Sequence, residues 1–404
     1  MTPAAGATVD GRFHLREQVG RGGFATVWLA DDQEEDAEVA LKVAETGTHE
    51  RAAVLESFQR EIRTLGRFEG AIAPSSVVRY LGGSIEASTS WIALEFLQGD
   101  PLADRFRTGS LGESVRRRIA LDLAATIDFL HRNDVVYLDI RPENVVVRRD
   151  GRPVLLDFNT AATTQGSIDL RFEVDQFKPP ELLPAVESRG EPGPHSDVYA
   201  WGKLAFYLFT DAKVLPVDVP TEGLDPRSFG GTCSRALADV VQRATRPDPD
   251  KRYATGMAVA DAVAAATSRR RALLTQASTD VACPVTDGKT MGRLSTDSGI
   301  PWVVLPDHGQ HVSPRHATVE ATPDGWVIED RSLNGTYVRA GDSWTHLLGE
   351  DGRERRRAAG GEEASVPTQS RAAVGPDTRI APVHPDYGIE LRLEPLDEGD
   401  GAPT

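Results

Sequence analysis

The chain has 404 residues, a length that suggests two or three domains and at least one large hydrophobic core. Only Cys233 and Cys283 are present, which excludes a disulfide framework and a cysteine-rich zinc site and favours a reducing, cytoplasmic setting. Sixty-one acidic residues against 45 basic ones give a formal net charge of −16, which argues against nucleic acid as the main partner. The longest stretch without a charged side chain, residues 158–168, is much shorter than the ~18 apolar residues of a membrane span, and residues 1–10 lack a secretory signal pattern.

After an N-terminal tail at 1–11, residues 12–267 alternate strand and helix signals, which predicts a mixed α+β domain. Ser110 and Glu113 form a possible capping box in front of a helix that would extend to His131. Its apolar face would consist of Ile119, Leu123, Ile127 and Leu130. Strands are expected at 13–20, 25–30 and 38–44, and a further helix at 51–67.

The second block, residues 281–395, contains short β-runs separated by Gly, Pro, Asn and Asp, which predicts an all-β sandwich. Residues 268–280 have little apolar pattern and are expected to be a flexible linker. Within the sandwich, the polar and charged stretch 349–370 is expected to be a disordered insertion, and 396–404 a C-terminal tail.

A glycine-rich loop, residues 20–27, lies between the first two predicted strands. Backbone without Cβ atoms can approach a polyphosphate closely and present N–H groups to it. A Rossmann fingerprint is disfavoured because this loop leads into a strand instead of a helix. A glycine-rich hairpin without a ligand is the alternative reading of the loop alone. The residues that would contact the nucleotide are Gly20, Gly22, Gly23 and Val27.

Charged and polar residues that follow have the spacing expected for phosphoryl transfer. Lys42 on the third predicted strand can hold phosphates, and Glu61 on the next helix can orient it. Asp139 and Asn144 are five residues apart, and Asp157 follows a buried apolar strand. This pattern provides a carboxylate that orients a hydroxyl group and two oxygen ligands for magnesium, Asn144 and Asp157.

These motifs resemble the eukaryotic-type protein kinase superfamily, especially its bacterial Ser/Thr members, over residues 12–267. Later landmarks agree: Glu181 ends a Pro-Pro-Glu motif, residues 197–202 match a buried helix, and Arg252 is where the family pairs an arginine with that glutamate. The resemblance implies a two-lobed fold, ATP with Mg²⁺ (or Mn²⁺) as cofactors, and Asp139 as the catalytic base, with Arg141 as the cation of the catalytic loop. It also implies an adenine site formed by Ala40, Glu95 and Leu97, next to the gatekeeper Leu94.

Four positions depart from the kinase pattern. Tyr137 and Leu138 stand where the family has His-Arg, so the arginine that usually reads an activation-segment phosphate is absent. Asn159 replaces a glycine, which leaves the magnesium-holding conformation accessible because Asn tolerates positive φ. Val174 stands where a threonine usually bonds the catalytic Asp.

The second block resembles a forkhead-associated (FHA) domain, a β-sandwich whose loops bind phosphothreonine peptides. The resemblance implies that Arg293 pairs with phosphate, Ser313 donates a hydroxyl hydrogen bond and Asn334 fixes the peptide backbone. Arg315 is one position later than the family's usual arginine because Pro314 precedes it. Asn334-Gly335 alone would read as a hairpin turn.

Together these features predict a cytoplasmic Ser/Thr protein kinase with an FHA module that recruits phosphothreonine-containing proteins. Its partners would be protein substrates, phosphoproteins and, through autophosphorylation, further copies of itself, with no nucleic acid and no membrane span. One alternative is a pseudokinase scaffold, which the changes beside Asp139 and Asp157 favour. The other is a small-molecule phosphotransferase, which the Glu181–Arg252 pair and the phosphopeptide reader oppose.

Overall fold

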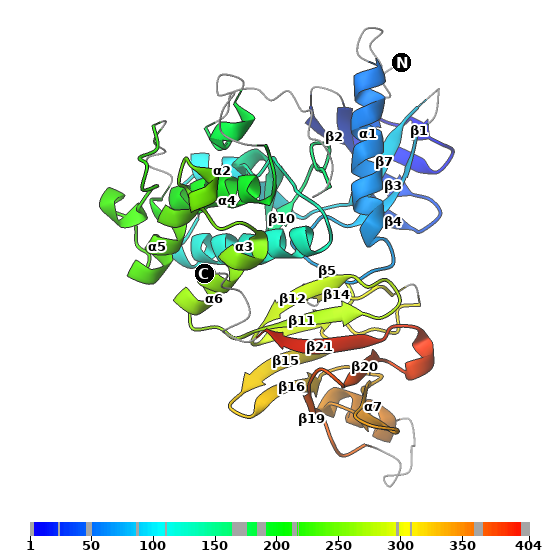
Figure 1. Cartoon of the computed structure of the whole chain (residues 1–404). Helices are drawn as coiled ribbons and strands as arrows, with labels where there is room; N and C mark the ends of the chain where they lie inside the picture. The colour runs from blue at the N-terminus through cyan, green and yellow to red at the C-terminus, as the bar shows by residue number, and fades with distance from the viewer. Residues whose placement is uncertain are drawn as a thin grey trace.

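The fold consists of a two-lobed α+β unit followed by a β-sandwich, as the sequence predicts (Figure 1). In Figure 1 the strands of the first lobe lie beside α1, the helical lobe lies next to them, and the sandwich lies below both. The computed structural model describes residues 4–22, 25–45, 51–85, 89–109, 111–163, 176–183, 191–211, 216, 218–295, 299–307, 309–358 and 367–396.

The first lobe is a six-stranded sheet flanked by one helix, α1 (Arg51–Leu65), which η1 (Gly66–Phe68) extends. The alternation of Val39, Leu41 and Val43 is confirmed, because all three side chains are buried. The sheet runs in the order β1 (Thr8–Val9), β2 (Phe13–Arg21), β3 (Ala25–Asp32), β4 (Ala37–Ala44), β7 (Trp91–Glu95), β6 (Tyr80–Ser84). Strand β1 lies within the expected N-terminal tail and pairs with β2, so the lobe begins earlier than residue 12.

The second lobe is mainly helical. Its central helix, α3 (Glu113–Arg132), buries the predicted face, including Ile119 and Leu130. Its N-cap is Gly112, which makes no side-chain capping bond, and Ser110 lies outside the described residues, so the predicted capping box does not begin this helix. The other elements are α2 (Leu102–Arg107), α4 (Pro194–Phe209), α5 (Arg235–Ala244), α6 (Gly256–Ala266), η2 (Pro142–Asn144), η3 (Pro180–Leu182), η4 (Pro226–Phe229), η5 (Pro249–Lys251) and the small sheet of β8 (Gly99–Pro101), β9 (Val145–Arg148) and β10 (Pro153–Leu155).

The sandwich consists of two sheets, and the rings of Trp302 and Trp326 are among its largest buried side chains. One sheet runs β12 (Ala282–Thr286), β11 (Arg271–Gln276), β21 (Leu391–Leu396), β20 (Arg379–Pro382), β17 (Thr336–Arg339), β18 (Trp344–Leu347), with η7 (Pro385–Tyr387) after β20. The other runs β19 (Arg371–Val374), β16 (Gly325–Asp330), β15 (Ala317–Thr322), β13 (Lys289–Gly292), β14 (Val303–Val304), β5 (Ala73–Pro74).

Strand β5 belongs to the kinase-like part of the sequence, yet it extends the second sheet of the sandwich. Ala73 and Pro74 pair with Val304 and Val303. The Ser75 N–H group continues the contact by donating to the Trp302 carbonyl at 2.8 Å. The edge strand β14 is therefore covered by the segment that connects α1 to β6.

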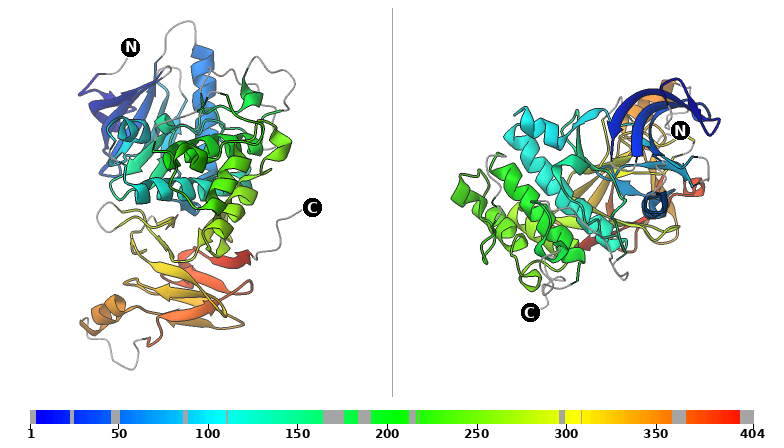
Figure 2. Two further views of the ribbon diagram at one scale, coloured as in Figure 1. Left: turned by 90° about the vertical axis from the view of Figure 1, so that its left-hand side faces the viewer. Right: turned by 90° about the horizontal axis from the view of Figure 1, so that it is seen from above.

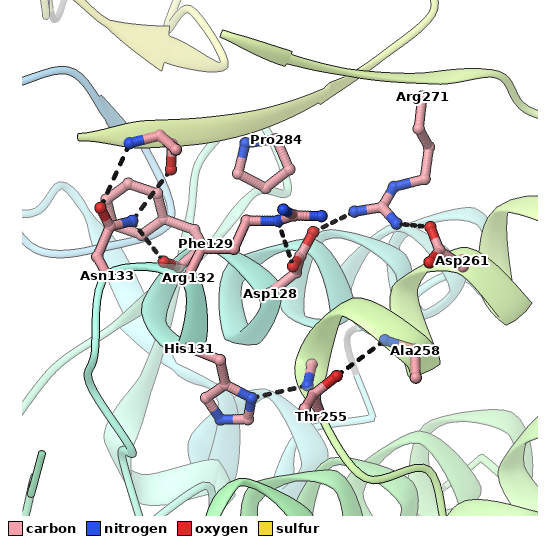
Figure 3. A network of polar contacts seen from close by, with 12 residues as sticks. Asp128, Phe129, His131, Arg132, Asn133, Thr255, Ala258, Asp261, Arg271 and Pro284 are labelled. Atoms are coloured by element: carbon pink, nitrogen blue, oxygen red, sulfur yellow. Dashed lines mark hydrogen bonds and ion pairs between the residues drawn. The ribbon is translucent and has the colours of Figure 1, made fainter. Parts of the chain in front are cut away.

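The expectation of a flexible linker is wrong. Residues 268–280 contain β11, the strand next to β21 in the sandwich. Arg271 at its start is buried and forms ion pairs with Asp128 of α3 and Asp261 of α6 (Figure 3). Asn133, labelled in Figure 3, donates to the Ala282 carbonyl in β12 at 3.0 Å and accepts from the Ala282 N–H group at 3.3 Å. Arg271, which the sequence places in the expected linker, is thus a clamp between the sandwich and the helical lobe.

Further contacts hold the sandwich against both lobes. Gln276 Oε1 accepts from the Ile72 N–H group at 2.8 Å, and Gln276 Nε2 donates to the Gly70 carbonyl at 3.2 Å. Lys289 Nζ lies 2.9 Å from Asp122 Oδ1 of α3. The left view in Figure 2 shows the sandwich lying against the rest of the chain. One hydrophobic core is continuous across the junction.

Part of the expected disordered insertion forms helix α7 (Glu350–Ala358). The helix can approach the sandwich closely because Gly352 is buried, and a Cβ there would lie 2.7 Å from the Ser332 carbonyl oxygen. Arg353 Nε donates to the Leu348 carbonyl at 2.9 Å. The small size of Gly352 and the hydrogen bond of Arg353 therefore help to order α7, although the composition of this segment suggests disorder. Across the described ranges, no helix is long and apolar enough to cross a membrane.

Candidate active site and phosphopeptide site

Three predicted residues from distant parts of the chain meet between the two lobes. Lys42 Nζ on β4 lies 2.7 Å from Glu61 Oε2 on α1 and 3.0 Å from Asp157 Oδ1 after β10. Burial lowers the pKa of Lys42, but the two carboxylates outweigh it and raise that pKa above the ordinary lysine value. Burial also raises the pKa of Glu61, against the opposing effect of Lys42. The ammonium therefore stays charged and is aimed between the lobes.

The catalytic loop holds Asp139 and Asn144 together. Asn144 Nδ2 donates to Asp139 Oδ2 at 2.6 Å and to the Asp139 carbonyl at 2.9 Å. Because the amide nitrogen is used in this way, the Asn144 side-chain oxygen is the atom left to ligate a cation. The loop itself is fixed by the buried carboxylate of Asp197, which accepts from the backbone N–H groups of Tyr137 and Leu138 at 2.7 and 2.6 Å.

The departures from the kinase pattern are accommodated by packing. Tyr137 places its ring edge-on to Phe158, with centroids 5.0 Å apart, and its hydroxyl donates to the Leu156 carbonyl. Leu138 has a φ of 67° and lies in a small apolar cluster with Val136 and Leu182. A buried leucine with apolar neighbours has nothing to offer a phosphate, which supports the prediction that this usual contact is absent.

The Nε atom of the predicted cation Arg141 donates to the Glu143 carboxylate at 2.8 Å. A residue that the sequence reasoning missed, Lys178, contacts Asp139. Its Nζ lies 2.6 Å from Asp139 Oδ1 and 3.4 Å from the Leu138 carbonyl. No local signal marks Lys178, because it lies 39 residues after Asp139 and meets it only in the folded chain.

The glycine-rich loop is a hairpin in which Gly20 pairs with Val27. Gly20 and Gly22 have ordinary φ, and a Cβ on either would meet only normal contacts, so the hairpin does not itself require glycine. Glycines at positions 20 and 22 would, however, allow a ligand to approach the backbone closely. Gly23 lies outside the described residues.

Three of the residues predicted to contact the nucleotide share one face of the first sheet. Val27 lies directly opposite Lys42 across the β3–β4 pair, and Ala40 precedes Lys42 by two positions, so all three face the same side of the sheet. Leu97 is partly buried against the main core. The Glu95 carboxylate is already used, since it accepts from the Arg79 N–H group at 3.0 Å and from Arg148 at 2.7 Å. The Glu95 N–H group is used as well, because it donates to the Arg79 carbonyl at 3.0 Å.

The polar groups fit a magnesium nucleotide. Asn144 and Asp157 supply hard oxygen donors from adjacent segments, since the Leu156 N–H group donates to the Asn144 carbonyl at 2.9 Å, and Lys42 supplies a cation. Among the described residues, no group of three or more His, Cys, Asp or Glu is placed to hold a metal alone. Nucleotide phosphate oxygens complete such a site in phosphotransferases.

The segment before the substrate site is anchored as predicted. Arg252 donates two hydrogen bonds to Glu181, at 2.7 and 3.0 Å, and both side chains are fully buried. Ser196 Oγ adds a third contact to Glu181 at 2.9 Å. This paired and saturated buried charge fixes the turn at η3, which lies beside Asp139.

The predicted phosphopeptide residues meet at one end of the sandwich. The Arg293 N–H group donates to the Ser313 carbonyl at 3.2 Å, and Ser313 Oγ accepts from the Leu333 N–H group at 3.1 Å. Asn334 Nδ2 donates to the His311 carbonyl at 2.7 Å. Arg293 Nε is buried and has no hydrogen-bond partner among the described residues. Residues Arg293, Ser313 and Asn334 thus lie in neighbouring loops of the sandwich.

His316 shapes these loops from inside. It is fully buried, and desolvation lowers its pKa to about 4, so the ring is neutral. Its Nδ1 accepts from the Ser313 N–H group at 3.2 Å, which leaves Nε2 to donate to the Gly335 carbonyl at 3.0 Å. Gly292 is needed next to it, since a Cβ there would lie 2.2 Å from the Pro314 carbonyl oxygen.

Arg315 is exposed and lies near Gly299, in the loop that follows Arg293. A residue outside the prediction also reaches this surface. Arg355 on α7 places Nη1 3.5 Å from Asn334 Oδ1. Sequence reasoning missed it because the surrounding stretch was expected to be disordered.

Comparison with known proteins agrees with this geometry. Residues 13–263 match the sequence model of the protein kinase domain, and residues 290–346 match that of the FHA domain. Serine/threonine-protein kinase PknA of Nostoc sp. is 27% identical over 280 residues, covering 63% of this chain and 47% of the relative. The kinase pkn2 of Myxococcus xanthus is 28% identical over 285 residues (64% and 33%), and PknA of Corynebacterium glutamicum is 25% identical over 319 residues (74% and 67%).

The chain spans half or less of the length of the first two of these relatives. The kinase match itself covers more than half of the chain, and the assembled Lys42, Glu61, Asp139 and Asp157 lie within it. The chain therefore belongs to the protein kinase domain family and carries an FHA domain after it.

Proposed function

We propose that this protein is an ATP-dependent Ser/Thr protein kinase whose FHA domain recruits phosphothreonine-containing proteins. The observation that carries the kinase proposal is the contact of Lys42 with both Glu61 and Asp157, at 2.7 and 3.0 Å. Active protein kinases require the lysine–glutamate pair, which positions the phosphates, and a metal held by the second aspartate.

In the proposed reaction, the hydroxyl oxygen of a Ser or Thr side chain forms a bond to the γ-phosphorus of ATP. The bond from that phosphorus to the β–γ bridging oxygen breaks, and ADP leaves. Asp139 orients the hydroxyl and accepts its proton, while Lys42 holds the phosphates and Glu61 holds Lys42. A magnesium ion held by Asn144 and Asp157 would neutralise charge on the phosphate oxygens.

The direct test is autophosphorylation of the full chain with ATP and magnesium or manganese. Lys42→Met and Asp157→Ala should each reduce label incorporation to background, because each removes a group that contacts the nucleotide or its metal. Arg235→Ala, which alters an exposed ion pair on α5, is the matched control and should keep wild-type labelling. Incorporation that persists in both site variants would contradict this assignment.

The reader function is supported by the meeting of Arg293, Ser313 and Asn334 in one surface. A phosphothreonine peptide should bind the full chain, and Arg293→Ala should remove that binding without lowering thermal stability. Arg331→Ala serves as control, because Arg331 is half exposed and pairs with Glu329 at 2.8 Å. Equal affinity for phosphorylated and unphosphorylated peptides would contradict a phosphate-reading role.

A pseudokinase scaffold is the second candidate, favoured by Leu138 and by Asn159 after the metal-binding motif. Self-association is a further part of the proposal. Since contacts of Arg271 and Gln276 hold the sandwich against the lobes, we propose that its ligand is phosphothreonine on a second copy or another protein. A cytoplasmic location is likewise proposed, with the free thiols of Cys233 and Cys283 as support.

A further inference from the structure

The carboxylate of Asp139 has a cationic neighbour that no motif assigns. Lys178 Nζ lies 2.6 Å from Asp139 Oδ1, while the opposite oxygen, Oδ2, accepts from Asn144 at 2.6 Å. Both carboxylate oxygens are thus held from opposite sides. Arg141 instead directs its Nε at Glu143.

The segment that carries Lys178 is rigid by construction. Phe177 before it is buried and packs edge-on to Tyr207, with ring centroids 6.0 Å apart. Pro179 and Pro180 follow it and fix φ on that side. Three residues after Lys178, Glu181 is held by Arg252. Because the backbone around Lys178 is already fixed, holding its ammonium group beside Asp139 costs little additional conformational entropy.

Lys178 is also nearly enclosed, with a side chain only 7% exposed, whereas that of Arg141 is 33% exposed. An ammonium desolvated to this degree next to a carboxylate stabilises a fixed orientation far more than an exposed ion pair does. Its compact charge fits beside Asp139, where the wide fork of an arginine would need more room.

We propose that Lys178 is the positioning cation of the active site and takes the place that the sequence pattern gives to Arg141. This inference rests on the proposed kinase function. Lys178 holds Asp139 Oδ1 so that the carboxylate points at the substrate hydroxyl while that hydroxyl forms its bond to the γ-phosphorus. The hydroxyl proton passes to the carboxylate, the bond to the β–γ bridging oxygen breaks, and ADP departs with that electron pair.

A purely structural role for Lys178 makes a different prediction. In that case the residue would support the turn that receives the protein substrate, and its loss would raise KM for that substrate. A positioning role acts on the bound complex, so its loss lowers kcat and leaves KM nearly constant. The two roles therefore separate in steady-state kinetics with an added protein or peptide substrate.

The experiment compares wild type with Lys178→Gln, Lys178→Met and Lys178→Arg in the full chain, at saturating magnesium and ATP. Lys178→Gln keeps a hydrogen-bond donor without the charge, so it still decides the question if the methionine variant fails to fold. Arg141→Met is measured alongside. Lys203→Met is the matched control, since Lys203 is also buried but donates to the Pro216 carbonyl at 2.8 Å. Thermal unfolding of each variant registers any loss of folding.

The expected result is a loss of kcat of about 100-fold for Lys178→Gln, with KM values within about twofold, and partial recovery in Lys178→Arg. Arg141→Met should lose less than Lys178→Gln. The inference is overturned by a kcat within about threefold of wild type in Lys178→Gln, by a change confined to KM, or by a larger loss in Arg141→Met. An inactive wild type would instead contradict the proposed function itself.

Discussion

A buried ion pair between Asp122 and Lys289 joins the kinase part to the sandwich, and removing one of its two charges should weaken their docking. Asp122 lies on α3 and Lys289 on β13, with Oδ1 and Nζ 2.9 Å apart. Their side chains are 7% and 19% exposed, and the ammonium also lies 3.9 Å from the centroid of the Trp302 ring. Burial lowers the pKa of Lys289, an effect that the Asp122 charge opposes.

Replacing Asp122 by Asn keeps the shape but leaves a buried ammonium without its counter-charge. Breaking such a pair on one side costs about 3–5 kcal/mol, which is roughly a 100- to 5000-fold shift in the equilibrium between docked and undocked states. The double variant Asp122→Asn with Lys289→Met removes both charges and should recover most of that loss, because an apolar replacement of a buried pair is often close to neutral.

The assay is denaturant unfolding combined with limited trypsin digestion near Arg269–Arg271. Asp239→Asn is the control, since Asp239 pairs with Arg235 on an exposed helical surface and should cost less than about 1 kcal/mol. Asp122→Asn should shift the midpoint strongly and speed cleavage of the junction. Equal behaviour of Asp122→Asn and Asp239→Asn, with no recovery in the double variant, would refute the docked arrangement and restore a flexible linker.

Three further outcomes follow from buried positions. His316 is neutral in the folded chain, where its pKa is about 4 instead of the ordinary 6.5. As the pH falls, this histidine therefore binds a proton in the unfolded chain before it does so in the folded chain. The unfolding free energy should fall as the pH drops from about 6.5 to 4, by at most about 3 kcal/mol, and His316→Asn should lose this slope in pH-dependent melts. Gly292→Ala should lower the melting temperature and phosphopeptide affinity because of its 2.2 Å clash with Pro314, whereas Gly375→Ala, which meets nothing within 4 Å, should change neither. Leu138→Arg should destabilise the chain by about 2 kcal/mol or more without raising transfer, since the new charge would enter an apolar cluster; a more active, equally stable variant would contradict this.

The sequence was sufficient to predict both folds and the meeting of Lys42 with Glu61. Lys42 lies within β4 and Glu61 within α1, while Asp157 follows β10, so no local pattern alone brings these residues together. The distance from Lys42 to Asp157, 3.0 Å, joins residues 115 positions apart, and the family resemblance supplied that pairing.

What the sequence could not show depends on contacts between the two units. In the sequence, Arg271 lies in a stretch typical of a linker. Only the folded chain brings Asp128 and Asp261 next to it. Strand β5 is only two residues long, so no periodic pattern marks it, and its partner β14 is equally short. Lys178 is equally unmarked, because the surrounding turn determines its neighbour.

The central claim is that this chain transfers phosphate, despite the changes at Tyr137, Leu138 and Asn159. It is tested most directly by incubating purified full-length protein and its Asp139→Asn variant with ATP and magnesium, followed by mapping of phosphorylated residues. We expect phosphoserine or phosphothreonine in the wild type and a loss of about 100-fold or more in Asp139→Asn, since the variant lacks the carboxylate that accepts the hydroxyl proton. Nucleotide binding without transfer in the wild type, or equal transfer in both proteins, would contradict it.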